Sequence, residues 1–170
     1  MTFSIWLEPS QQDAKHLRKI IKHLAKKHDA PTFAPHVTLH SGIKRYRDAE
    51  NAVRNCTAFS KLHLETKGIR YSDYLWKTLF AEIKKDDYVK QLNKCLKNSL
   101  ERQVKYEFKP HLSLIYKKLD ANTKSKLVRT MNVKRHVVFD KITIIVSSKN
   151  VKAWKKKKTI YLKKPTTIRS

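Results

Sequence analysis

The sequence predicts an α+β protein, and three observations support that fold class. A seven-residue phrase occurs twice, as FAPHVTL at 33–39 and as FKPHLSL at 108–114. Each half of the chain reads in the same order: a helix, a strand that begins at the histidine of the phrase, a second helix and two strands. No low-complexity linker divides the halves. We therefore expect residues 1–170 to form one domain of two interlocked lobes, each an antiparallel sheet with helices on its outer face.

The first half begins with a strand and an amphipathic helix. FSIWL at 3–7 is a short apolar run rich in β-forming residues and reads as a buried strand. Ser10 followed by Asp13 resembles a capping box. Apolar residues at helical spacing then predict a helix to about Lys27. The other expected elements are the histidine strand closed by Gly42, a helix at 47–56 and strands at 61–70 and 74–83.

The second half repeats this order. Asp86 opens a helix whose apolar residues lie at helical spacing, with Leu92 and Leu96 among them. The strand HLSLIY begins at His111. The remaining elements are a helix near 121–131 and strands at 136–147 and about 152–162.

Composition indicates a folded protein with a phosphate-bearing ligand. The chain is 40% hydrophobic, enough to build a core. Thirty-nine Lys and Arg against 14 Asp and Glu give a net charge of +25, for which nucleic acid is the first candidate partner. The lysines are spread along the whole chain, however, and a compositional bias explains that distribution equally well. Charge alone therefore does not identify the ligand.

Cysteine usage and the apolar runs predict the compartment. Cys56 and Cys95 have no C-x-x-C or metal-ligand spacing, so we expect the reduced thiols of a cytosolic protein. The start of the chain lacks a basic leader with a long apolar run, so no signal peptide is expected. The longest apolar stretch, at 142–146, is too short to cross a bilayer. We expect a cytoplasmic monomer with no membrane partner.

The repeated phrase places a histidine and a hydroxyl on one side of each strand. Alternate strand residues face the same side, so His36 lies with Thr38 and His111 with Ser113, each pair about 7 Å apart at Cα. The aliphatic residues between and after them point into the core. If the lobes pack about a pseudo-twofold axis, both pairs can face one cleft.

Several chemistries fit this set of residues poorly. His36 and His40 lie about 13 Å apart along an extended strand, too far for one metal ion. No HExxH motif or carboxylate cluster accompanies either phrase, so neither a metal nor another cofactor is expected. Ser113 is not in a G-x-S-x-G elbow, and no P-loop is present.

Two histidines that act as acid and base fit well. One neutral imidazole can take a proton from water while a second, charged imidazole protonates the departing alkoxide. The hydroxyls of Thr38 and Ser113 can donate hydrogen bonds to non-bridging phosphate oxygens. In-line displacement at phosphorus puts the attacking and leaving oxygens on opposite sides, where a symmetric pair of histidines would flank them.

The two H-x-[ST] phrases, 75 residues apart, resemble those of the 2H phosphoesterase superfamily. Together with SIWLEP near the start and YLWKTLFAEI in the middle, they resemble its cyclic phosphodiesterase branch, which acts on 2′,3′-cyclic nucleotides and ADP-ribose 1″,2″-cyclic phosphate. The resemblance implies a bilobal fold with a central cleft and metal-independent catalysis. It makes His36 and His111 the catalytic pair, and Thr38 and Ser113 the phosphate-binding hydroxyls. It also matches Trp6 and Tyr116 to aromatic residues that line the cleft and could stack on a base or ribose.

The leading hypothesis is therefore hydrolysis of a ribose cyclic phosphodiester, with a small cyclic nucleotide as substrate. Two alternatives stay open: an RNA-directed enzyme of the same superfamily (a 2′,3′-cyclic end hydrolase, a 2′-5′ phosphodiesterase or a 2′-5′ ligase), and an RNA-binding module without catalysis. Lys44, Arg45 and Arg47 could extend an RNA backbone track. The lysine run at 155–158 reads equally well as a solvated edge strand.

Overall fold

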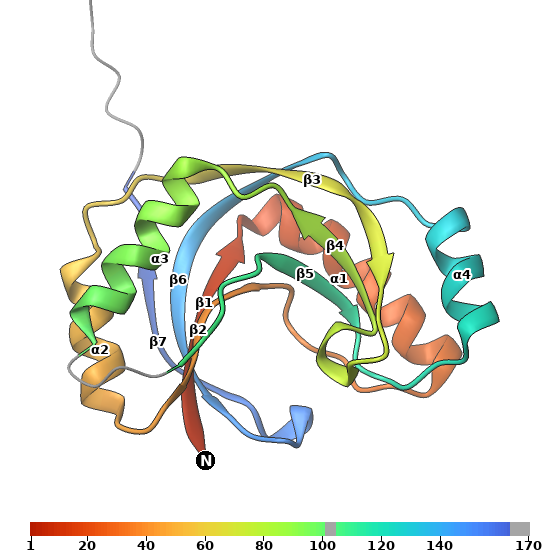
Figure 1. Ribbon diagram of the computed structural model, residues 1–170, viewed down its shortest axis with the longest axis horizontal. Coiled ribbons are helices and arrows are strands. Elements are labelled where there is room, and N and C mark those ends of the chain that lie inside the picture. The colour runs from red at the N-terminus through yellow and green to blue at the C-terminus, as the bar shows by residue number, and fades with distance from the viewer. Residues whose placement is uncertain (101–104, 164–170) are drawn as a thin grey trace, which may run out of the picture.

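The computed structural model describes residues 1–100 and 105–163 (Figure 1). Its strands are β1 (Thr2–Pro9), β2 (Val37–Ile43), β3 (Leu62–Tyr71), β4 (Leu79–Ile83), β5 (His111–Ile115), β6 (His136–Ser147) and β7 (Lys155–Tyr161). Its α-helices are α1 (Gln11–His28), α2 (Tyr46–Asn55), α3 (Asp87–Ser99) and α4 (Ala121–Thr130). The expected order of helix, histidine strand, helix and two strands is confirmed in both halves.

The strands form one seven-stranded sheet in the order β1-β2-β5-β4-β3-β6-β7, and every pairing is antiparallel. The α+β class is confirmed, but the two separate sheets expected from the repeat are joined into one. Two contacts join them. Strand β2 pairs with β5 at Val37 and Leu112, and the long strand β6 pairs with β1 on one edge and with β3 and then β7 on the other.

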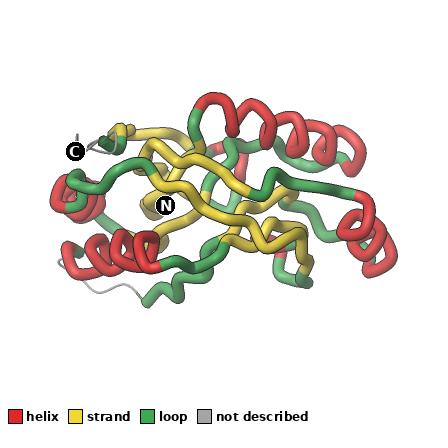
Figure 2. The backbone as a smooth tube through the Cα atoms, turned by 90° about the horizontal axis from the view of Figure 1, so that it is seen from above, coloured by secondary structure: helices red, strands yellow, loops and turns green. Residues whose placement is uncertain are grey.

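The helices lie at the two ends of a strongly curved sheet (Figure 1). Helices α2 and α3 lie together at one end, and α1 and α4 lie at the other, as the view from above also shows (Figure 2). Each end thus combines one helix from the first half of the sequence with one from the second. The two ends of the sheet therefore do not correspond to the two halves of the sequence.

Local capping explains where α1 begins and how it is attached to the sheet. The Ser10 side chain accepts a hydrogen bond from the Asp13 N–H, as the sequence predicts. The Asp13 carboxylate does not close the box. It accepts instead from Lys134 Nζ at 2.7 Å and from the Val138 N–H at 2.7 Å, and so fixes the helix to β6.

The core lies on the side of the histidine strands that the alternation predicts. Val37, Leu39, Leu112 and Leu114 are fully buried, so the histidines and hydroxyls that alternate with them lie on the opposite face. Within the described parts of the chain, no helix is long and apolar enough to cross a membrane.

Two expected strands are shorter than the sequence predicts. The segment 74–83 begins with a 3₁₀ turn at Leu75–Lys77, and only Leu79–Ile83 forms β4. Local hydrogen bonds favour the turn: the Ser72 hydroxyl donates to the Lys77 carbonyl, and the Thr78 hydroxyl donates to the Leu75 carbonyl. The segment 152–162 likewise begins with a 3₁₀ turn, at Val151–Ala153, before β7.

The expectation of reduced thiols is wrong. Cys56, at the C-terminal end of α2, and Cys95, in α3, form a disulfide. The two helices come from different halves of the sequence, so the spacing of the cysteines gives no sign that they meet. The argument for a cytosolic protein loses its cysteine support, and a cytoplasmic location stays a prediction.

The disulfide should contribute substantially to stability. It closes a loop across a sequence separation of 39 residues, for which chain entropy predicts a contribution of about 4 kcal/mol to the free energy of unfolding. We expect reduction with dithiothreitol to lower the midpoint of urea denaturation. The double variant Cys56→Ser, Cys95→Ser is the control and should not respond to reductant. An equal midpoint for the oxidised and reduced wild type would contradict the pairing.

Candidate active site

The register of β2 against β5 brings the two phrases face to face. Val37 pairs with Leu112 in antiparallel register. One step away on either side, His36 is therefore opposite Ser113, and Thr38 is opposite His111. Directly opposed residues of an antiparallel pair lie about 4.5–5.5 Å apart at Cα with their side chains on one face. The four residues predicted from the repeat thus converge at one place on the sheet.

Each histidine is oriented by the same backbone contact. The Nδ1 atom of His36 lies 2.7 Å from the Ala34 carbonyl oxygen, and that of His111 lies 2.7 Å from the Lys109 carbonyl oxygen. A carbonyl only accepts, so Nδ1 carries the proton in both rings. In the neutral form Nε2 is then the nitrogen with a free lone pair. The proline between each carbonyl and its histidine holds the preceding residue extended, which favours this contact.

Aromatic rings surround both imidazoles, but in different geometries. The Trp6 ring stacks on His36 with centroids 3.5 Å apart and planes 5° apart. Phe80 instead meets His111 edge to face at 5.5 Å. His36 is 4% exposed, whereas His111 is only half-buried. The two histidines are therefore equivalent in hydrogen bonding and unequal in solvation.

Burial lowers the pKa of both histidines. Desolvation, aided by the charges of His111 and Lys156, lowers the pKa of His36 to about 3 against the opposing effect of the Ala34 carbonyl. Desolvation also lowers the pKa of His111, and the nearby charge of Lys77 acts in the same direction. The carbonyls of Lys109 and Trp76 oppose that shift, because they stabilise the charged imidazole.

A cavity of about 700 Å³ lies on this face of the sheet. His36, His111, Thr38, Trp6 and Tyr116 all line it, so the structure brings together five of the six residues named from the sequence. Ser113 is not among the residues that line it.

The position of Ser113 is defined by its hydrogen bonds. It is 4% exposed, and its hydroxyl donates to the Trp76 carbonyl at 3.0 Å. Its proposed role as a phosphate donor stays a prediction that requires the hydroxyl to turn toward the ligand.

Trp6 and Tyr116 each stack on another aromatic side chain of the protein. Trp6 has His36 on one face, and Tyr116 stacks on Phe33 with centroids 4.1 Å apart. Burial raises the pKa of the Tyr116 hydroxyl, which keeps it neutral. Both residues line the cavity, and their role in binding a base or ribose stays a prediction.

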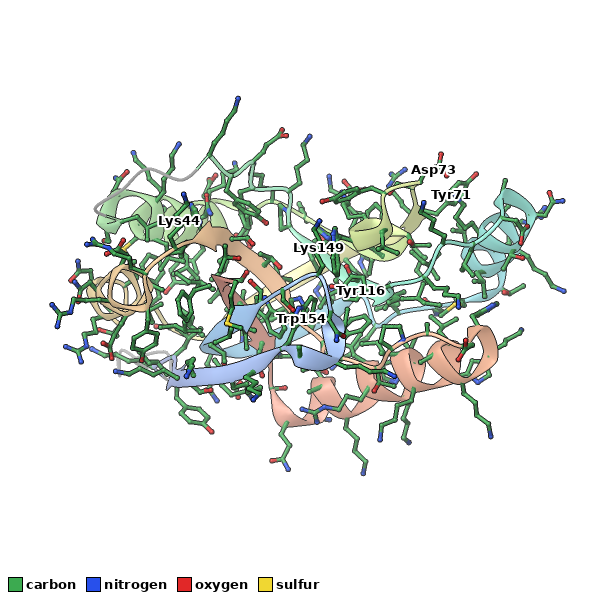
Figure 3. The ribbon with its side chains drawn as sticks, turned by 90° about the horizontal axis from the view of Figure 1, so that it is seen from below. Lys44, Tyr71, Asp73, Tyr116, Lys149 and Trp154 are labelled. Carbon is green, nitrogen blue, oxygen red and sulfur yellow. A yellow bond between two sulfur atoms is a disulfide. The ribbon has the colours of Figure 1, made fainter. Side chains whose placement is uncertain are left out.

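Sequence reasoning missed several residues of the cavity wall. Trp76 and Trp154 stack with centroids 5.8 Å apart. Trp76 lies in the 3₁₀ turn before β4, and Trp154 directly follows the 3₁₀ turn before β7. Figure 3 shows Trp154 and Lys149 grouped with Tyr116, while Lys44 lies well away from them. The basic residues expected to track RNA after the first histidine strand do not line the cavity. Those that do are Lys77, Lys109 and Lys149.

The side chains that line the cavity suit proton transfer to and from a bound anion. Two imidazoles, the hydroxyl of Thr38 and three lysines lie around one space. Across the described residues, no three His, Cys, Asp or Glu side chains gather as metal ligands would.

Comparisons with known proteins identify the family. A family model described as cyclic phosphodiesterase-like protein matches residues 1–165. The cyclic phosphodiesterase of Arabidopsis thaliana is 21% identical over 126 residues, which cover 72% of this chain and 68% of that protein.

Solved structures share the fold. The apo form of Escherichia coli LigT superposes with a TM-score of 0.64 at 15% identity and covers 96% of this chain and 98% of its own. TT0787 of Thermus thermophilus gives a TM-score of 0.64 at 13% identity and covers 97% of this chain and 100% of its own. Because the family model spans nearly the whole sequence, the chain belongs to the cyclic phosphodiesterase-like family of the 2H phosphoesterase superfamily.

Proposed function

We propose that the protein hydrolyses a cyclic phosphodiester on ribose to a phosphomonoester, by acid–base catalysis with two histidines and without a metal. One observation carries the proposal: His36 and His111 line one cavity from adjacent strands, and each has Nδ1 bonded to a backbone carbonyl. That arrangement leaves two Nε2 atoms to exchange protons with a bound ligand. The cyclic phosphodiesterase of Arabidopsis supports the reaction class.

The unequal surroundings of the histidines suggest which one is the base. His36 is the more buried and stacks on a neutral ring, so its neutral form dominates and it can take a proton from the attacking water. His111 is more open, and two carbonyls stabilise its charged form, so it is the proposed acid. Water then adds to phosphorus, one ring P–O bond breaks, and the proton of His111 passes to the departing ribose oxygen.

Removing either imidazole should abolish most of the turnover. We expect His36→Ala and His111→Ala each to lower kcat for a 2′,3′-cyclic mononucleotide by about 10²–10⁴-fold, in excess EDTA throughout. His63→Ala is the matched control, because His63 is exposed on β3 and outside the cavity. Retained turnover in either catalytic variant, or loss of wild-type turnover in EDTA, would exclude this mechanism.

The pH profile should be displaced to the acid side. The base works once His36 is neutral, above about pH 3, and the acid works only while His111 is charged, below its lowered pKa. We therefore expect kcat/KM to fall as pH rises through 6.5, by up to about tenfold per unit. Initial rates with a cyclic substrate between about pH 4 and pH 9 would measure this slope, since that range spans the ordinary pKa of histidine. A rate that rises above neutral pH would refute the assignment of acid and base.

The hydroxyls of Thr38 and Ser113, one from each copy of the repeated phrase, should contribute unequally to kcat/KM. Thr38 lines the cavity, so Thr38→Val should lower kcat/KM about a hundredfold if its hydroxyl stabilises the charge on phosphate. Ser113→Ala should cost at most about tenfold, because the Ser113 hydroxyl already donates to Trp76. Equal, large losses in both variants would show that Ser113 turns to bind the phosphate.

A second candidate substrate is RNA that ends in a 2′,3′-cyclic phosphate. Three lysines line the cavity, and the net charge of +25 favours a polyanion. E. coli LigT, which shares this fold, has been solved in complex with 3′-AMP and in complex with phosphate.

Salt dependence separates the two substrates. An RNA enzyme should show a higher kcat/KM for an oligonucleotide than for a mononucleotide. That advantage should also decline steeply with salt. The logarithm of the affinity for a single strand falls against the logarithm of the salt concentration with a slope of about −0.7 for each phosphate contacted. Equal rates for both substrates at every salt concentration would favour the mononucleotide.

A further inference from the structure

Four hydroxyls form a connected array on one wall of the cavity. Thr2 and Ser4 project from β1, Ser41 from β2 and Ser147 from the end of β6, and all four line the cavity. The Ser4 oxygen lies 2.9 Å from that of Ser41 and 2.9 Å from that of Ser147. The Thr2 and Ser147 oxygens are 3.3 Å apart. None of these residues has a part in the reaction proposed above.

The direction of every hydrogen bond in this hydroxyl array follows from one carbonyl. The Ser147 hydroxyl lies 3.2 Å from the Thr2 carbonyl oxygen, which can only accept a hydrogen bond. Ser147 therefore donates its hydroxyl proton to that oxygen. In its contacts with Thr2 and Ser4, Ser147 must therefore accept, and both of those hydroxyls donate to it. Because the Ser4 hydroxyl proton is donated to Ser147, the hydroxyl of Ser41 must donate to Ser4.

All protons of the hydroxyl array are therefore used internally. The hydrogen-bonding capacity that remains is that of oxygen lone pairs as acceptors, chiefly those of Ser41 and Thr2 at the two ends of the array. Such a surface accepts hydrogen bonds and offers no donor to a phosphate oxygen. A cationic ligand is disfavoured as well, because the described residues that line the cavity include three lysines, Lys149 among them, against one carboxylate, that of Glu107. The matching ligand group is a neutral hydrogen-bond donor.

The hydroxyl array lies within reach of the catalytic histidines. Thr2, Ser4 and Trp6 alternate along β1 and share a face, so Ser4 lies about 7 Å from Trp6 along the strand. Trp6 stacks directly on His36. A nucleoside attached to a cyclic phosphate at the histidines can span that distance.

We propose that the hydroxyl array is a nucleoside subsite, which accepts hydrogen bonds from a neutral donor of the substrate. The groups of a cyclic nucleotide that supply this chemistry include the exocyclic amino group of cytosine, adenine or guanine and the 5′-hydroxyl. The inference rests on the proposed function for the nature of the ligand. It divides the cavity into a phosphate end, at the histidines, and a nucleoside end, at the hydroxyl array.

Two variants remove acceptors without leaving an array proton unpaired. Ser41→Ala deletes one end of the array, and Ser4 keeps its bond to Ser147. Thr2→Val deletes the other end, and Ser147 keeps its bond to the Thr2 backbone carbonyl. Thr159→Val is the matched control, because the Thr159 hydroxyl pairs with that of Thr143 on the same sheet but lies outside the cavity.

The test is equilibrium binding by calorimetry, which does not depend on turnover. The probes are 3′-CMP, 3′-UMP and 5′-deoxy-3′-CMP, because cytosine has an exocyclic amino group and uracil has none. We expect Ser41→Ala or Thr2→Val to raise the Kd of 3′-CMP by about three- to tenfold relative to Thr159→Val. A loss confined to the two cytosine ligands identifies the amino group as the donor. If 3′-CMP and 3′-UMP weaken together and the 5′-deoxy ligand does not, the donor is the 5′-hydroxyl.

Two results would overturn the proposal. One is an unchanged Kd for all three ligands in both variants, and the other is a weakened affinity for inorganic phosphate, which would make the hydroxyl array an anion site. Failure of the proposed function is recognised separately. In that case the wild type would not turn over cyclic phosphodiesters, whatever the binding experiment shows.

Discussion

Val37 pairs with Leu112, and the geometry of the site depends on this contact between β2 and β5. Both side chains are fully buried, so the pair is held by the core on one face while the other face is left to the histidines and hydroxyls. Because strand side chains alternate, a slip of one residue in either strand would turn its histidine into the core. The constraint that joins the two halves of the protein thus also aligns the site.

The two halves contribute the same atoms in unequal surroundings. In each copy a carbonyl two residues before the histidine holds Nδ1, so both rings have one tautomer and one orientation. The neighbouring strands then differentiate the copies. Strand β1 supplies Trp6, which stacks on His36, and β4 supplies Phe80, which meets His111 with its edge. The duplicated phrase thus places two imidazoles with the same backbone contact in different surroundings.

The sequence was sufficient to predict the order of elements, the α+β class and the residues that converge at the cavity. Those predictions used strand alternation and local repetition, which are properties of short segments. The joining of two sheets into one depends on pairing between distant strands. The Cys56–Cys95 disulfide depends on the meeting of helices from opposite halves. Neither has a local signal.

The residues of the cavity wall also lack a local signal in the sequence. Trp76 and Trp154 lie in segments that read as strands, and hydrogen bonds such as that from Ser72 to Lys77 turn the first of these segments into a 3₁₀ turn. The hydroxyl array was also invisible, because Thr2, Ser4, Ser41 and Ser147 come from three strands and are joined only in the folded protein. The phrase was sufficient to predict that the two histidines meet, and the shape of the space around them could not be predicted.

The central claim is that backbone carbonyls hold both histidines with a proton on Nδ1 and a free Nε2 in the cavity. The most direct test is a ¹⁵N NMR titration of the imidazoles, with His36→Ala and His111→Ala used to assign the signals. The account predicts that both rings are neutral Nδ1–H tautomers at pH 7, with the pKa of His36 below that of His111 and both below 6.5. An Nε2–H tautomer at either histidine, or a pKa above 6.5 at His36, would contradict it.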